Sequence, residues 1–271
     1  MSATTLSPVL YIPHGGGPLP LLGEPSHRAL AEFLEGIGKR LPRPEAILVV
    51  SAHWETEVPA LTSGATPELI YDYYGFPEES YHIQYPAPGA PTLAQSIQTL
   101  LRDAGFDAQS APQRGFDHGL FVPLKLMYPD ADIPCLQLSL LHDLNPERHI
   151  RLGRALTALR EQGVVILGSG MSFHNMQAFY DRADSPQGHD AAVFEQWLVD
   201  TCCEEGLDWE QRESRLAHWQ QAPGARYCHP REEHLLPLHV CLGAACAQGK
   251  PAQLVFRDQV LGKSVVSLLW D

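Results

Sequence analysis

The chain has 271 residues, a formal net charge of −13 and a hydrophobic content of 44%. This content is enough for a large folded core, and the strong negative charge argues against nucleic acid or an anionic membrane surface as a partner. No apolar run approaches the roughly 20 residues of a membrane-spanning helix, and the N-terminus does not resemble a signal peptide. Six cysteines without a Cys-x-x-Cys pair argue against a zinc ribbon or a disulfide framework. We therefore expect one cytoplasmic domain over residues 1–271.

Strand-like and helix-like segments alternate along the chain. Short segments rich in aliphatic and β-branched residues predict buried strands at 9–12, 46–50, 133–140, 164–167 and 263–270. Apolar residues at helical spacing predict helices at 26–40, 90–104, 146–162 and 191–204. This alternation predicts an α/β fold with a largely parallel sheet covered on both faces. The longest irregular stretch, 71–91, is rich in aromatic residues and proline, and we expect it to form an ordered wall.

Three of the expected strands run into a histidine. The first is followed by His14, the second by His53, and the strand at 164–167 by His174. In an open α/β sheet the carboxyl ends of the strands meet at the edge where ligands bind. A divalent transition metal needs rigid imidazole or carboxylate ligands and open positions for chemistry. One histidine at a strand end is more often structural, but three at one edge favour a metal site.

Two other histidines are candidates for the same site. His234 opens an apolar run that resembles the start of a helix, so we prefer it as a ligand to His229, which precedes a proline in the approach. His118 follows Asp117, whose carboxylate is expected to fix the tautomer of the imidazole. We expect His118 to carry a proton or support the site rather than bind metal.

The glycines Gly15 to Gly17 follow His14 directly and allow two interpretations. A glycine run after a strand can cradle a phosphate, or it can leave space for a substrate to reach the histidine. The phosphate interpretation fails because no Lys-Ser/Thr pair follows, the G-x-G-x-x-G spacing is missing, and Pro18 removes an N–H donor. The segment around Ser169 does not match the G-x-S-x-G of a serine hydrolase, and H-E-x-x-H is absent.

Six segments together resemble a known family. They are "PHGGGP", "VVSAHW", "YGFPEESYHIQYPAPGAP", "RGFDHGLFVPLKLMYPDADIP", "LGSGMSFHN" and "EEHLLPL". In this order, and over nearly the whole chain, they resemble the class III extradiol ring-cleaving dioxygenases of the 4,5-DOPA dioxygenase extradiol type. The resemblance implies a three-layer α/β fold with one non-haem metal at the carboxyl ends of the strands. Fe(II) is the implied catalytic metal, and Zn(II) is an occupant known in similar proteins.

The resemblance also implies roles for individual residues. His14 and His53 match the two ligands at strand ends, and His234 matches the third ligand. His174 matches the catalytic acid/base, which is also a possible fourth ligand for zinc, and His118 matches a histidine near the substrate. Some relatives use a glutamate as third ligand, so a carboxylate from the neighbouring Glu232 or Glu233 stays open. The "PHGGGP" form departs from the "GHGSP" common in this group, which leaves the substrate's identity open.

The implied reaction opens the ring of a catechol with O2 and gives a muconic semialdehyde. His174 would take a proton from the catechol, and Trp54, Tyr73, Tyr74 and Phe76 could stack on the ring. Two alternatives remain. One is a zinc-dependent hydrolase that activates water at the same histidines. The other is a non-enzymatic binding protein similar to the Memo proteins.

Overall fold

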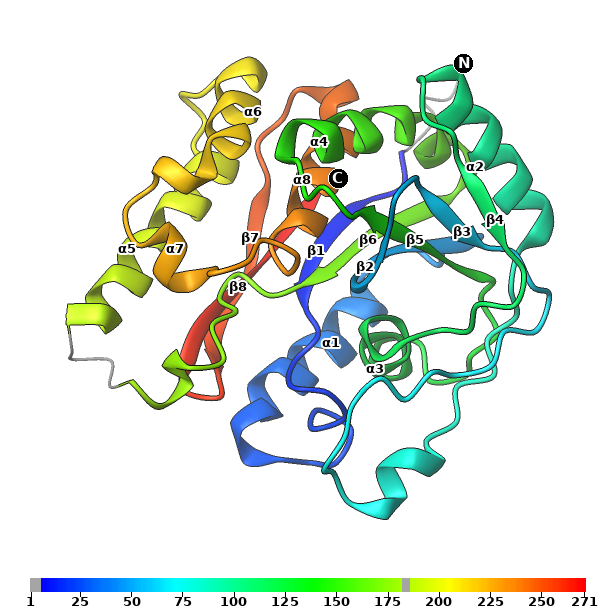
Figure 1. Cartoon of the computed structure of the whole chain (residues 1–271), viewed down its shortest axis with the longest axis horizontal. Coiled ribbons are helices and arrows are strands. Elements are labelled where there is room, and N and C mark those ends of the chain that lie inside the picture. The colour runs from blue at the N-terminus through cyan, green and yellow to red at the C-terminus, as the bar shows by residue number, and fades with distance from the viewer. Residues whose placement is uncertain (1–5, 182–185) are drawn as a thin grey trace.

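The structure, a computed structural model, describes residues 6–181 and 186–271. In these residues one mixed sheet has eight strands in the order β4-β3-β5-β2-β6-β1-β8-β7 (Figure 1). The strands are β1 (Val9–Pro13), β2 (Ala46–Thr56), β3 (Ala60–Thr62), β4 (Gln109–Ala111), β5 (Cys135–Leu141), β6 (Val164–Gly170), β7 (Gln253–Val260) and β8 (Lys263–Trp270). The central strands β5, β2, β6 and β1 run parallel, whereas β8 is antiparallel to β1 and to β7. β3 pairs antiparallel with β5 and parallel with β4.

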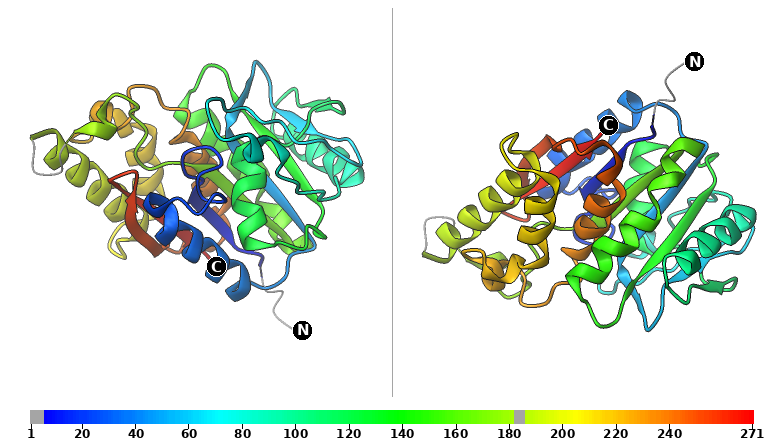
Figure 2. Two further views of the ribbon diagram at one scale, coloured as in Figure 1. Left: turned by 90° about the horizontal axis from the view of Figure 1, so that it is seen from below. Right: turned by 90° about the horizontal axis from the view of Figure 1, so that it is seen from above.

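Helices cover both faces of this sheet. They are α1 (Arg28–Arg40), α2 (Pro91–Asp103), α3 (His118–Met127), α4 (Pro146–Ala155), α5 (Pro186–Cys203), α6 (Trp209–Ala217), α7 (Ala225–Cys228) and α8 (Leu236–Ala244). Helices α1 and α3 lie on one face and α4 and α8 on the other, as the two views of Figure 2 show. The expected three-layer α/β fold is confirmed.

Two glycines allow helices α4 and α8 to pack closely together. A Cβ on Gly153 of α4 would overlap the carbonyl oxygen of Val240 in α8, and a Cβ on Gly243 of α8 would overlap that of Ile150 in α4. The backbones of α4 and α8 are therefore in direct contact. Helix α8 in turn packs on β6 and β1, the strands that lead to the site described below.

All five predicted strands are present, and β2 is longer than expected. Strands β1, β5 and β6 are buried along their whole length, as their continuous apolar sequences predict for strands covered on both faces. β2 continues past the predicted end at Val50 to Thr56, and its pairing with β5 shifts register between Val50 and Glu55. His53 thus lies inside the strand, at an irregularity that re-aims the side chains around it.

Three strands were not predicted. β3 and β4 have only three residues each, and β7 is a mostly exposed edge strand with a polar sequence. The predicted helix at 146–162 ends at Ala155 and continues as a 3₁₀ helix, Thr157–Gln162. Strands of three residues, and edge strands with a polar sequence, do not stand out from loops in a sequence.

The aromatic segment 71–91 is ordered. It contains one short 3₁₀ helix, Glu78–His82, and the Tyr71 and Tyr73 hydroxyls donate hydrogen bonds to the carbonyl oxygens of Ile83 and Ser80. These bonds join the two halves of the segment, so it forms the wall expected from its composition.

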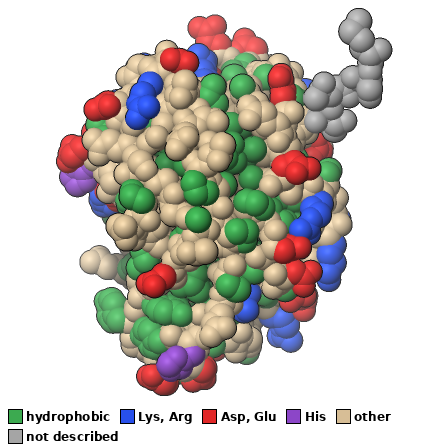
Figure 3. Space-filling view, turned by 90° about the vertical axis from the view of Figure 1, so that its right-hand side faces the viewer, with side chains coloured by type: hydrophobic (Ala, Val, Ile, Leu, Met, Phe, Trp, Pro, Cys, Tyr) green, Lys and Arg blue, Asp and Glu red, His purple; other side chains and the backbone are tan. Residues whose placement is uncertain are grey.

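No helix in the described residues has both the length and the apolar character needed to cross a membrane. On the side of the molecule shown in Figure 3, Lys and Arg side chains are interspersed with acidic ones and do not gather into one basic patch.

Candidate active site

A pocket of about 410 Å³ opens beside the carboxyl ends of β1, β2 and β6. His14 directly follows β1, and its backbone N–H donates to the Gly170 carbonyl, which extends the pairing of β1 with β6 by one residue. Five histidines line this pocket: His14, His53, His118, His174 and His234. The structure therefore brings together the five histidines that the sequence analysis favoured.

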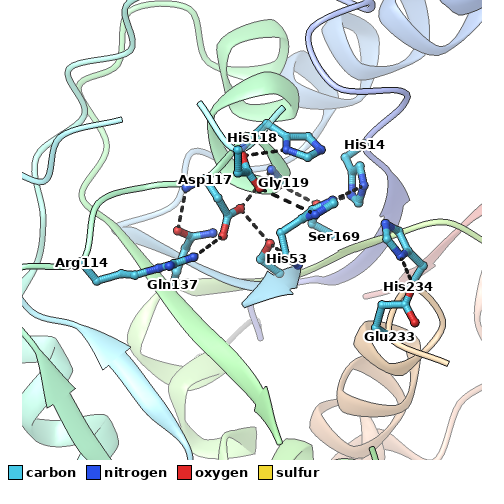
Figure 4. Close-up of polar contacts among 12 residues, drawn as sticks. His14, His53, Arg114, Asp117, His118, Gly119, Gln137, Ser169, Glu233 and His234 are labelled. Atoms are coloured by element: carbon cyan, nitrogen blue, oxygen red, sulfur yellow. Dashed lines mark hydrogen bonds and ion pairs between the residues drawn. The ribbon is translucent and has the colours of Figure 1, made fainter. Parts of the chain in front are cut away.

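Three of these histidines form a group that could hold a metal ion. The Nε2 atoms of His14 and His53 are 3.0 Å apart, and potential ligand atoms of His14, His53 and His234 all lie within 4.8 Å of one another. Figure 4 shows these three rings and His118 gathered around a common space. Three converging imidazole nitrogens suit a divalent transition metal that keeps positions open for other ligands.

Burial keeps the three imidazoles of this group in the neutral form. Burial lowers the pKa of His14 and His53 well below the usual histidine value, and the neighbouring histidines lower both further. Burial likewise lowers the pKa of His234 to about 4. All three imidazoles are therefore neutral at pH 7, which is the form that binds a metal.

Ser169 fixes the tautomer of His14. The Ser169 hydroxyl donates its proton to the carbonyl oxygen of Gly119, 2.5 Å away. Oγ of Ser169 also lies 3.0 Å from Nδ1 of His14. Because the hydroxyl proton is already used in the bond to Gly119, Oγ must accept the hydrogen bond from His14. The proton of His14 is thus on Nδ1, and the lone pair of Nε2 is free to face the group.

Glu233 does the same for two histidines on the opposite side. Its Oε1 atom lies 2.9 Å from Nδ1 of His234 and 3.2 Å from Nδ1 of His174. The two imidazole rings are stacked with centroids 3.4 Å apart. Burial alone would raise the pKa of Glu233, but the hydrogen bonds with His174 and His234 outweigh burial and hold the pKa well below its usual range. The carboxylate stays ionised and accepts from both rings.

The contacts of the two glutamates bear on the carboxylate-ligand alternative. Glu233 also pairs with Arg231, whose guanidinium makes a bidentate contact of 2.6 Å with Glu55. Glu232 pairs instead with Arg226 at 3.0 Å and does not line the pocket. Glu233 remains within reach of a metal held by His174 and His234, but its hydrogen bonds to their Nδ1 atoms make it a support for those rings.

Asp72 is the functional candidate that the sequence analysis missed. Its Oδ1 atom accepts hydrogen bonds from the backbone N–H of His118 at 3.0 Å and from Nδ1 of the same residue at 2.8 Å. Its Oδ2 atom lies 3.7 Å from Nδ1 of His53. Burial would raise the pKa of Asp72, but the hydrogen bonds from His118 outweigh it and the pKa is lowered. Asp72 lies 46 residues before His118, so no local motif links the two.

The expectation that Asp117 fixes the tautomer of His118 is wrong. The Asp117 carboxylate caps the start of α3 by accepting from the Gly119 N–H, and it also accepts from Ser51 Oγ at 2.8 Å. Arg114 donates to its other oxygen at 3.2 Å. At the start of a helix, a short carboxylate turns back to the free N–H groups of the first turn, which here points it away from the imidazole (Figure 4).

Two further residues do not join the pocket. His229 is buried and its Nε2–H donates to the Ser172 carbonyl at 3.0 Å, outside the pocket lining. Trp54 does not line the pocket either, unlike Tyr73, Tyr74 and Phe76. Because successive side chains of a strand point to opposite faces, Trp54 turns away from His53 and packs under the guanidinium of Arg114, 4.7 Å from the ring centroid.

The glycine run is needed for a tight turn as well as lining the pocket. Gly15 and Gly17 have φ values of +83° and +56°, which side chains disfavour. A Cβ on Gly15 would come within 2.6 Å of Pro20, and the Gly16 N–H donates to Nε2 of the buried His27. The local fold thus favours glycine at 15 and 17 even before any substrate is considered.

Known proteins resemble this chain over most of its length. A family model described as the catalytic LigB subunit of aromatic ring-opening dioxygenase matches residues 8–266. The chain belongs to this family. The expectation of a ring-opening dioxygenase of the extradiol type is confirmed, and enzymes of the LigB family depend on a metal.

Individual relatives agree with this assignment. The chain is 39% identical to the dioxygenase tasH of Hapsidospora irregularis, covering 98% of this chain and 86% of the relative. It is 38% identical to the 4,5-DOPA dioxygenase extradiol of Beta vulgaris, covering 94% and 92%. A crystal structure of an uncharacterized protein from Escherichia coli K12 superposes with a TM-score of 0.77 at 31% identity, over 98% of this chain and all of that one.

Proposed function

We propose that this LigB-family chain opens the ring of a catechol-type substrate with O2 and forms a muconic semialdehyde. The observation that carries the proposal is the group of His14, His53 and His234, whose neutral imidazoles converge on the floor of a pocket with aromatic walls. Fe(II) is the metal we expect in the active enzyme, and Zn(II) suits the same ligands. Bound Fe(II) would supply the chemistry by which O2 reacts with the aromatic ring.

His174 is the proposed acid/base. Its Nδ1 atom is held by the ionised Glu233, so its Nε2 atom is the one that would take a proton from a catechol hydroxyl. The ring would then be an imidazolium beside a carboxylate. This charge pair stabilises the protonated ring until the proton returns to the product. His174 stacks on His234, and it is therefore also close enough to the group to serve as a fourth ligand for zinc.

His118 is the second proposed catalytic residue. Its Nδ1–H donates to Asp72, which leaves the Nε2 lone pair as an acceptor for a substrate hydroxyl. The ring of Tyr73 is 5.8 Å from that of His118, and Tyr74 and Phe76 line the same pocket. These aromatic side chains would hold the catechol ring against the histidines.

Oxygen consumption tests the proposal. The protein is loaded with Fe(II) under anaerobic conditions, mixed with one of several catechols that include DOPA, and then exposed to air. We expect oxygen uptake together with a yellow product, and neither before air is admitted. A zinc-dependent hydrolase would convert its substrate without oxygen. Metal-loaded protein that converts no catechol would contradict the proposal and favour a binding protein.

A further inference from the structure

The pocket has an apolar outer part above its histidine floor. Tyr74 is 91% exposed and Met176 is 66% exposed, although both line the pocket. Among the described residues, Leu254 is the one other large hydrophobic side chain that is exposed, at 38%. We call the apolar outer lining the rim; it consists of Leu19, Tyr74, Phe76, Met176, Phe179 and Leu261. Apolar side chains gathered at a pocket mouth mark a surface that becomes covered when a ligand binds.

The described lining offers no partner for a charged substituent. It contains no Lys or Arg among residues 6–181 and 186–271. The nearby cations are engaged elsewhere: Arg231 pairs with Glu55 and Glu233, and Lys263 donates to the Asp181 carbonyl. A carboxylate on a substituent that packs between the rim and the histidine floor would lose part of its hydration without gaining an ion pair with Lys or Arg. The net charge of −13 also repels anions.

A positively charged substituent is no better accommodated. Asp72 is the carboxylate in the described lining, and its oxygens already face His118 and His53. An ammonium group that formed an ion pair with Asp72 would compete with His118 for the carboxylate that orients its ring. The lining therefore disfavours both signs of charge beyond the ring.

We infer that the substrate is a catechol that carries an uncharged, apolar substituent long enough to reach Tyr74 and Met176. This inference rests on the proposed ring-opening function. The pocket volume of about 410 Å³ lies in the range of sites that hold whole small-molecule ligands, so there is room beyond the ring. Each methylene buried against the rim is expected to tighten binding about fourfold.

Equilibrium binding tests the inference without turnover. Protein loaded with Zn(II) is titrated anaerobically, by calorimetry, with catechol, 4-methylcatechol, 4-propylcatechol, 3,4-dihydroxyphenylacetate and DOPA. We expect the Kd to fall about fourfold for each added methylene and both charged catechols to bind more weakly than 4-propylcatechol. Charged catechols that bind as tightly as 4-propylcatechol would overturn the inference.

Rim variants locate the preference. Met176→Ser should weaken binding of 4-propylcatechol several-fold and leave unsubstituted catechol unchanged. Tyr74→Ser should weaken binding of 4-propylcatechol more than that of catechol, because Tyr74 also faces the ring. Leu254→Ser is the matched control, because it removes an exposed apolar side chain outside the pocket. Met176→Arg should tighten binding of 3,4-dihydroxyphenylacetate by about tenfold or more, since it supplies the missing cation. An equal loss with Leu254→Ser, or no change in either rim variant, would overturn the inference.

The two proposals fail in different ways. If apolar catechols bind as expected but Fe(II)-loaded protein does not open them in air, the ring-opening proposal fails and the preference stands. If catechols are opened but charged ones bind best, only the inference about the substituent fails.

Discussion

The floor and the rim of the pocket are built in opposite ways. On the floor, His14 directly follows β1, His53 lies near the carboxyl end of β2, and His234 precedes α8. Ser169 and Glu233, which lie outside the pocket lining, bond to the rings of His14 and His234. On the rim, Tyr74 and Met176 extend from irregular segments into solvent. Rigid strand ends suit chemistry that needs fixed positions, whereas exposed loop residues can change with little effect on the fold. This difference fits the two proposals above, in which the floor carries out the reaction and the rim selects the substrate.

The largest effect should come from removing a proposed ligand on the floor. His14→Ala and His53→Ala should each weaken metal binding by more than about 100-fold and abolish ring opening, because the two imidazoles that remain do not hold the ion firmly. Metal content after dialysis, measured by mass spectrometry, checks this. His82→Ala is the control, since His82 is exposed and lies outside the pocket lining. Full metal retention in His14→Ala would contradict the ligand assignment.

Removing the proposed acid/base should separate chemistry from metal binding. His174→Ala should lower kcat by about 10²- to 10⁴-fold while the protein keeps much of its metal. Paired measurements of kcat and metal content on the same preparation test this separation. An unchanged kcat would remove His174 from the mechanism, and loss of the metal along with activity would make it a ligand.

A buried histidine far from the pocket should affect stability rather than chemistry. His149 accepts a hydrogen bond from the Leu141 N–H and donates to the Asn145 carbonyl between β5 and α4. Burial lowers its pKa to about 4, so between pH 6.5 and 4 the unfolded chain binds more protons than the folded one. This contribution is complete above pH 6.5, and up to about 3 kcal/mol is lost as the pH falls to 4.

Urea unfolding at several pH values measures that contribution. His149→Gln should flatten the dependence of the free energy of unfolding on pH between 6.5 and 4 compared with the unchanged chain. Identical pH dependences for the two proteins would show that His149 is not the group responsible.

The smallest effects should come from the carboxylates behind the histidines. Glu233→Gln should cost about 10- to 100-fold in metal affinity or turnover, since Glu233 supports both His174 and His234. Asp72→Asn should slow turnover and affect metal affinity less, because Asp72 bonds closely to His118 but lies 3.7 Å from His53. Equal losses of metal affinity in the two variants would contradict the separate roles of these carboxylates.

The sequence predicted the floor better than its supports. Strand ends meeting at one sheet edge were enough to bring His14, His53 and His174 together. Asp72 and Ser169 escaped prediction because each meets its histidine through the folded chain, across 46 and 155 residues. Trp54 was misplaced because the strand was expected to end at Val50, whereas β2 continues to Thr56 and its side chains alternate, so Trp54 points away from the face that His53 occupies.

The origin of the oxygen in the product tests the central claim most directly. Fe(II)-loaded protein is given 4-propylcatechol under isotopically labelled dioxygen in ordinary water, and the product is weighed by mass spectrometry. A ring-opening dioxygenase must place oxygen from the labelled gas into the open-chain semialdehyde. A product that carries oxygen only from water, or that forms equally well without dioxygen, would contradict the account.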